Sequence, residues 1–315
     1  MDAAVYLFTG FMDSGKTTLI DQTLLEGDFS DGKGLIIVCE EGEKEFDVNA
    51  YKKIGVEIVY IESEEEFTLE TLQMYDFRYR PEQVFIEYNG TWEVAKILEM
   101  KLPTGWELVQ HLATVDATTF QLYLTNMRSM IMEQMFGADL VLLNRVDESM
   151  PLSSFRGTIK AYNRKAVIVY ERSDGTIIEN VNEQLPYDIQ QEKLEISDAD
   201  FGIFFMDSQE HPERYDGKVI EFLGYIYRPK DQFKNQPEFV GGRFAMTCCE
   251  DDTQFIGYRC KGYLAAPGIS HKSWQLITAR AKKEYIKEYD ADGIVLYPIE
   301  VKEQPAPLDP LIYFN

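Results

Sequence analysis

Short apolar runs alternate with stretches of helical spacing in the first half of the chain. The runs are rich in β-branched and aromatic residues, which is typical of buried strands. They predict strands over residues 3–8, 34–39, 55–61, 83–88, 108–115, 138–143 and 166–170. Helical spacing is found over residues 17–25, 92–100 and 120–137. Continuous apolar strands that alternate with helices predict an α/β fold, in which helices cover both faces of a mainly parallel sheet.

In the second half of the chain, the pattern of apolar and polar residues changes to one dominated by predicted strands. Residues 182–193 are polar, contain a proline and are predicted to form a linker. Further strands are predicted over residues 218–227, 243–249, 254–260 and 293–301, and residues 274–289 have a helix-like composition and spacing. This pattern predicts a smaller β-rich domain with an OB-like barrel. Since a domain has about 150 residues, the length of 315 residues agrees with two domains, which we place at residues 1–187 and 188–315.

The charge narrows the choice of partners. The chain has 31 basic and 54 acidic residues, a net charge of −23, and this excess disfavours binding to nucleic acid or to anionic lipid. No apolar stretch approaches the roughly 18 residues that a membrane-spanning helix needs. The first residues do not resemble a signal peptide. Four cysteines are too few for a disulfide scaffold, so we expect a cytoplasmic protein with reduced thiols.

A phosphate-binding motif follows the first predicted strand. Residues 10–17 read GFMDSGKT and match the Walker A pattern G-x-x-x-x-G-K-[ST] in full. Lys16 is expected to reach the β- and γ-phosphates, Thr17 to bind Mg²⁺ and Thr18 to donate to the α-phosphate. The alternative is a turn whose two glycines serve only the backbone, but a position between a strand and a helix favours phosphate binding. The residues predicted to surround the nucleotide here are Gly10, Asp13, Ser14, Gly15, Lys16, Thr17 and Thr18.

Two further segments end predicted strands in the order that a nucleotide site requires. Glu87 lies near the end of one strand, where its carboxylate is expected to hold Mg²⁺ together with Thr17, and the N–H group of Gly90 is expected to contact the γ-phosphate. A structural role for Glu87 is the alternative. The segment 144–147 reads NRVD and is similar to the guanine-binding pattern Asn-Lys-x-Asp.

The NRVD segment predicts a preference for guanine. The carboxylate of Asp147 can accept from both N1–H and N2–H₂ of guanine, whereas adenine has no such pair of donors, and a polar site strongly rejects an analogue that lacks its partners. Asn144 and Arg145 complete the predicted site, and Arg145 stands where the pattern has lysine. The alternative is an ordinary turn.

Acidic and thiol groups near the second strand are candidates for chemistry. Glu40 and Glu41 are predicted to position the attacking water, with Lys16 as the third catalytic residue. Cys39 is either a metal ligand near the γ-phosphate or a core cysteine. A second metal hypothesis joins Cys248 and Cys249 to Cys260 and His271. Neighbouring strand residues face opposite ways, and a tight turn over residues 250–253 would place Cys260 opposite Arg243, so we favour buried structural thiols.

The motifs together resemble the CobW/HypB/UreG family of GTPases, specifically its CobW-like branch. The resemblance rests on GFMDSGKTTLI, the segments 86–90 and 114–117 and the NRVD segment, and it covers roughly residues 3–185. It implies a protein that binds GTP and Mg²⁺, hydrolyses GTP slowly and delivers Zn²⁺, Co²⁺ or Ni²⁺ to a target protein. The Cys-x-Cys-Cys motif usual in this branch is absent, because residues 61–66 read IESEEE.

The second part is similar to the C-terminal domain of YcgQ-like permease subunits. The matching segments are residues 215–219, 224–227 and 242–249. This resemblance implies a fold and a connection to membrane transport, but no reaction.

The sequence thus predicts a Mg²⁺-dependent GTPase that is coupled to a partner and takes part in the handling or assembly of a metal cofactor. The cofactors expected are GTP and Mg²⁺, with a transition metal such as Zn²⁺ as a further candidate. The partners expected are GTP or GDP and a client or transporter-associated protein, without nucleic acid or membrane insertion, and a homodimer is one option for the oligomeric state. One alternative is a nucleotide-gated transporter adaptor with negligible hydrolysis. Another is phosphoryl transfer from ATP to a small molecule, against which the guanine motif argues.

Overall fold

The chain forms two compact units in a computed structural model. Residues 1–150 and 162–181 form the first unit, and residues 151–161 and 182–315 form the second. The domain boundary predicted at 187/188 stays a prediction. The structure describes residues 2–26, 32–147, 149–163, 165–178, 185–228, 238–246, 253–262, 271–287 and 291–312.

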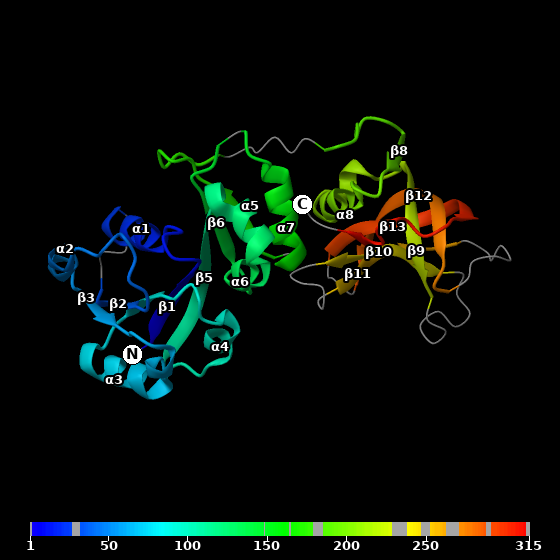
Figure 1. Cartoon of the computed structure of the whole chain (residues 1–315). Helices are drawn as coiled ribbons and strands as arrows, with labels where there is room; N and C mark the ends of the chain where they lie inside the picture. The colour runs from blue at the N-terminus through cyan, green and yellow to red at the C-terminus, as the bar shows by residue number, and fades with distance from the viewer. Residues whose placement is uncertain are drawn as a thin grey trace. The chain divides into compact units, whose positions relative to one another are not determined.

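A seven-stranded sheet with the order β3-β2-β4-β1-β5-β6-β7 forms the centre of the first unit (Figure 1). All six neighbouring pairs of strands are parallel. The predicted parallel sheet is therefore confirmed, and each of the seven predicted runs overlaps one strand. The strands are β1 Ala3–Thr9, β2 Gly34–Val38, β3 Val56–Tyr60, β4 Gln83–Glu87, β5 Trp106–Asp116, β6 Leu140–Asn144 and β7 Val167–Tyr170.

Helices in the connections cover this sheet. Helix α1 runs directly into a π-helical turn, and the helix predicted over residues 120–137 is divided into α5 and α6. The helices of this unit are α1 Lys16–Asp21, α2 Val48–Lys53, α3 Leu69–Tyr79, α4 Val94–Glu99, α5 Ala117–Asn126 and α6 Arg128–Glu133; the shorter turns are η1 Gln22–Glu26 and η2 Glu64–Glu66. Helix α7, Leu152–Tyr162, belongs to the second unit except for its last residue.

Both faces of the parallel sheet are buried. In β2, Leu35 and Ile37 belong to one apolar cluster, whereas Ile36 and Val38 belong to another. This explains why the strand is apolar at every position instead of alternating. The loops that leave the carboxyl ends of such strands form one edge, where ligands bind in open α/β sheets.

The second unit contains a closed ring of five strands. Strand β10 pairs with both β9 and β11, and the ring order is β9-β10-β11-β13-β12. This order agrees with the predicted OB-like, β-rich domain. Its elements are β8 Lys193–Ile196, α8 Phe201–Glu210, η3 Pro212–Arg214, β9 Val219–Tyr227, β10 Phe239–Met246, β11 Thr253–Cys260, β12 Trp274–Ile286, β13 Ala291–Glu303 and β14 Leu311–Ile312.

The predicted helix in this unit was wrong, and the predicted linker ends one residue too late. The helix predicted over residues 274–289 is strand β12, which pairs along its length with β13 and also with β9. Alanine, lysine and glutamate favour a helix in isolation, but cross-strand packing overrides this preference. The end of the predicted linker, Lys193, already belongs to β8.

The register of the β10–β11 hairpin also differs from the prediction. Cys260 lies opposite Phe239, not opposite Arg243. The two strands pair as far as Met246 and Thr253, whereas the prediction assumed a tight turn over residues 250–253. Cys248 and Cys249 lie outside the described residues.

None of the helices in the described ranges has the length and hydrophobicity needed to span a lipid bilayer.

Candidate nucleotide-binding site

The phosphate loop joins β1 to α1 and has a backbone that requires glycine. Gly10 and Gly15 have φ angles of 132° and 107°. A Cβ atom on Gly10 would lie 2.3 Å from the carbonyl oxygen of Thr114, and one on Gly15 would lie 2.5 Å from Nδ2 of Asn144. The two glycines of the motif therefore serve both the turn and its close packing against β5 and β6.

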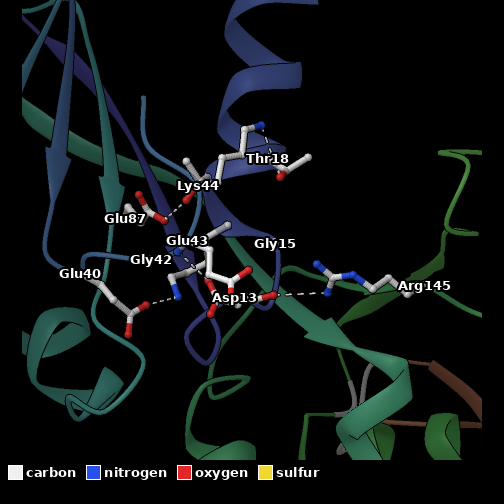
Figure 2. Close-up of a pocket in the computed structure, with 11 residues that line it drawn as sticks. Asp13, Gly15, Thr18, Glu40, Gly42, Glu43, Lys44, Glu87 and Arg145 are labelled. Carbon is white, nitrogen blue, oxygen red and sulfur yellow. Dashed lines mark hydrogen bonds and ion pairs between the residues drawn. The ribbon is translucent and has the colours of Figure 1, made fainter. Parts of the chain in front are cut away.

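A cavity opens beside this loop (Figure 2). It brings together eight predicted residues from four separate segments of the chain. Gly42, Glu43 and Lys44, which closely follow Glu40 in the chain, complete its wall. The predicted residues in the wall are Asp13, Gly15, Lys16, Thr17, Thr18, Glu40, Glu87 and Arg145.

Lys16 is buried at the floor of the cavity and donates to three oxygen atoms. Its Nζ lies 2.8 Å from the carbonyl oxygen of Gly10 and 2.9 Å from that of Phe11. The third oxygen belongs to the carboxylate of Glu40, 2.5 Å from Nζ. The other carboxylate oxygen of Glu40 accepts from the N–H group of Gly90 at 3.3 Å.

Thr17 and Glu87 lie together, as the sequence predicted for a Mg²⁺ site. The Thr17 hydroxyl donates to Oε1 of Glu87 at 2.6 Å. Burial raises the pKa of Glu87, and the hydrogen bond from Thr17 and the charge of Lys16 oppose that shift. A hydroxyl and a carboxylate are hard oxygen donors, so this pair fits Mg²⁺.

The segment 40–44 crosses the cavity and is held to the phosphate loop and α1. The N–H group of Glu43 donates to the carboxylate of Asp13 at 3.0 Å. Lys44 lies 2.5 Å from the carboxylate of Asp21 and 3.4 Å from the hydroxyl of Thr18. The residues that follow β2 therefore touch the loop that is expected to hold phosphate.

A second cavity lies next to the first, along α1. Asn144 and Arg145 line it, and Arg145 also lines the first cavity. Asn144 donates to the carbonyl oxygen of Ser14 at 2.6 Å, and Arg145, with a φ of 54°, forms an ion pair with Asp116 at 2.8 Å. The whole wall consists of Gly15, Thr18, Leu19, Gln22, Leu142, Asn144, Arg145, Glu171, Arg172, Ser173 and Gly175.

The part of this wall formed by residues 171–175 was missed by the sequence reasoning. The available signal was position, since these residues directly follow β7 and therefore lie at the same edge of the sheet as the phosphate loop. Glu171 is half-buried, and burial raises its pKa.

Asp147 does not line either cavity. Its carboxylate accepts from the N–H and hydroxyl groups of Ser149, and these hydrogen bonds lower its pKa. The guanine contact of Asp147 stays a prediction.

Four other predicted residues lie around the cavities. Ser14 is buried, with its hydroxyl 2.7 Å from that of Thr114. A Cβ on Gly90 would lie 2.5 Å from the carbonyl oxygen of Gly10, so the Gly90 backbone lies against the phosphate loop. Glu41 is exposed and does not line the cavity. Cys39 is buried in the apolar core.

The described thiols have the surroundings of core residues. Burial raises the pKa of Cys39, and it raises the pKa of Cys260 to about 12. Both shifts favour the protonated thiol over the thiolate that binds metals. His271 is exposed, and its Nδ1 accepts from the N–H group of Arg228. Within the ranges that the structure describes, no three His, Cys, Asp or Glu side chains are grouped to hold a metal ion.

Solved structures with a similar fold include two HypB proteins. The hydrogenase maturation factor HypB from Archaeoglobus fulgidus has a TM-score of 0.39 and 16% identity over 55% of this chain and 82% of its own. HypB from Helicobacter pylori in complex with nickel has a TM-score of 0.36 and 15% identity over 55% of this chain and 80% of its own. A Zn(II)-bound triple mutant of the YjiA GTPase has a TM-score of 0.44 and 15% identity over 86% of this chain and 92% of its own. A comparison with curated proteins found no match.

Family models cover both parts of the sequence. Residues 173–314 match the DUF1980 C-terminal domain, where the resemblance to YcgQ-like subunits was found. Residues 4–170 match the CobW/HypB/UreG nucleotide-binding domain. The latter match spans more than half of the chain and includes the whole phosphate loop. The chain therefore belongs to the CobW/HypB/UreG family of P-loop GTPases.

Proposed function

We propose that this protein binds GTP with Mg²⁺ at the phosphate loop and hydrolyses it slowly, and that its nucleotide state controls binding to a partner protein. The observation that carries the proposal is the convergence of Lys16, Thr17 and Glu87 on one cavity beside the glycine loop. A cation, a hydroxyl and a carboxylate at this place are the groups that a triphosphate with its metal ion requires.

The proposed reaction is an in-line attack of water on the γ-phosphorus, which breaks the bond to the β-phosphate oxygen and releases GDP and phosphate. Lys16 and the loop N–H groups stabilise the negative charge that develops on the phosphate oxygens. Mg²⁺, held by Thr17 and, through water, by Glu87, would neutralise further charge. Glu40 or Glu41 would orient the attacking water.

The base would occupy the second cavity, with Asn144 and Arg145 in its wall. Asp147 would then accept from N1–H and N2–H₂ of guanine. Calorimetry with GTP and ATP in the presence of Mg²⁺ tests both parts of the site. We expect tighter binding of GTP, strong weakening in Lys16→Ala, and loss of the guanine preference in Asp147→Ala. An unchanged preference in Asp147→Ala would remove the guanine assignment, and tighter binding of ATP by the wild type would favour a phosphotransferase.

Single-turnover hydrolysis separates a GTPase from a nucleotide-gated adaptor. We expect one slow turnover of bound GTP that requires Mg²⁺ and Lys16, whereas an adaptor would return the GTP intact. The same assay with candidate clients measures whether a partner accelerates the step.

The metal-handling role is supported by family membership alone. Elemental analysis of the purified chain, followed by dialysis against Zn²⁺ with and without GTP, tests it. We expect Zn²⁺ binding to depend on the nucleotide, and absence of bound metal in both states would remove this part of the proposal.

A further inference from the structure

The carboxylate of Glu40 holds the two groups that are expected to bind the γ-phosphate. One of its oxygens lies 2.5 Å from Nζ of Lys16, and the other accepts from the N–H group of Gly90. The side chains of Lys16 and Glu40 are only 2% and 4% exposed. An internal anion therefore takes the contacts for which the sequence predicts a phosphate.

The neighbours of Glu40 hold the same segment over the cavity. Asp13 of the phosphate loop accepts from the N–H group of Glu43, and Lys44 is paired with Asp21 of α1. Figure 2 shows Glu40, Gly42, Glu43 and Lys44 in the wall of the cavity. The carboxylate of Glu40 accepts from Nζ of Lys16.

We propose that Glu40 is a specificity-determining residue that substitutes for the γ-phosphate in the empty and GDP-bound states, so that GTP binds only by displacing it. The inference rests on the proposed function, because it requires that the cavity bind a triphosphate. It goes beyond that function by naming the residue that sets the relative affinity for GTP and GDP.

The charge of Glu40 and the three N–H donors of Lys16 explain why a γ-phosphate would displace the carboxylate. All three oxygen atoms around Nζ of Lys16 belong to the protein, so a phosphate oxygen must replace one of them. Glu40 is the anionic member of the three, and two anions at one ammonium repel each other. A β-phosphate alone leaves the contact between Glu40 and Gly90 in place, whereas a γ-phosphate competes for both contacts of the carboxylate.

Displacement also has a consequence for the chain. Since the side chain of Glu40 ties its segment to Lys16 and Gly90, its release frees the start of residues 40–44. The released carboxylate would then be beside the γ-phosphate, where the proposed mechanism needs a residue that orients water.

Calorimetry on the full chain tests the inference with GDP and with the β,γ-imido analogue of GTP, both with Mg²⁺. Glu40→Gln removes the charge with little change in size, and Glu40→Ala is a second variant without the carboxylate. Glu45→Gln is the matched control, because Glu45 is an exposed acid that directly follows this segment and lines neither cavity. We expect both Glu40 variants to bind the analogue about tenfold more tightly relative to GDP than the wild type does.

An unchanged or smaller ratio of the two affinities in the Glu40 variants would overturn the inference, and so would an equal gain in Glu45→Gln. These results differ from failure of the proposed function, in which the wild type binds neither nucleotide or Lys16→Ala binds them normally. If neither Glu40 variant folds, the amide resonance of Gly90 in ¹⁵N-glycine-labelled wild type decides. We expect it to move with the analogue and not with GDP, and an equal shift with both would overturn the inference.

Discussion

The contact between Gly15 and Asn144 joins the two sequence motifs on which the nucleotide site depends. A Cβ on Gly15 would lie 2.5 Å from Nδ2 of Asn144, and the same Nδ2 donates to the carbonyl oxygen of Ser14. Asn144 therefore supports the phosphate loop directly, in addition to any contact with the base. At this scale, a single side chain connects the phosphate and base parts of the site.

Gly15→Ala tests this packing. The new methyl group meets Asn144 at a left-handed backbone position, so we expect the free energy of unfolding to fall by about 1–3 kcal/mol and GTP binding to be lost. The matched control is Gly157→Ala, in the middle of α7, where a Cβ meets no atom within 4 Å. There we expect a gain of up to about 1 kcal/mol, because alanine favours a helix. Urea unfolding and calorimetry measure both variants, and equal effects at the two positions would contradict the packing argument.

His111 is a buried histidine behind the phosphate loop. Its Nε2 lies 2.9 Å from the hydroxyl of Thr9, which donates to the carbonyl oxygen of Gln134. Burial lowers the pKa of His111 to about 4, and the nearby charge of Asp139 only partly opposes this shift. The side chain is thus neutral in the folded protein at neutral pH.

A lowered pKa predicts sensitivity to acid. The unfolded chain binds a proton at His111 below about pH 6.5 and the folded chain only below about pH 4, so this contribution to stability is complete above pH 6.5 and is lost as the pH falls toward 4. When the pH is lowered from 7 to 4.5, the free energy of unfolding should fall in both proteins. We expect the fall to be smaller in His111→Gln than in the wild type by about 2–3 kcal/mol. Urea unfolding at the two pH values measures the difference, and parallel losses would refute the assignment.

Strand β12 shows how pairing decides an element. Its inward positions Gln275, Ile277, Ala279 and Ala281 are buried, whereas Arg280 is exposed. This alternation has the period of a strand, although the composition favours a helix. The alanines lie inside the closed ring, where side chains from five strands converge.

Substitution along β12 tests the alternation. Ala279→Asp places an unpaired charge inside the barrel, and we expect it to reduce the free energy of unfolding by about 3 kcal/mol or more. Arg280→Asp changes the neighbouring exposed position, and we expect it to reduce the free energy of unfolding by less than about 1 kcal/mol. Chemical unfolding of the two variants gives the comparison, and similar losses would argue against the strand.

The two units have separate apolar cores, and the chain as a whole is strongly acidic. The first unit buries both faces of its parallel sheet, and the second buries one aromatic-rich cluster that includes Phe204, Phe222 and Tyr258. The chain has a net charge of −23, and acidic residues also lie in the wall of the cavity beside the phosphate loop. The positive charges in the wall of this cavity belong to Lys16, Lys44 and Arg145.

The sequence by itself determined the parallel sheet, the phosphate loop and the pairing of Thr17 with Glu87, because these depend on local pattern and on which strand ends are neighbours. Only the tertiary structure decided that residues 171–175 line the second cavity, that residues 274–286 form a strand and that Cys260 lies opposite Phe239. It also brought Glu40 to both Lys16 and Gly90. The physical reason is that these contacts join residues far apart in the chain, and cross-strand pairing and the path of a loop leave no periodic signal in the residues themselves.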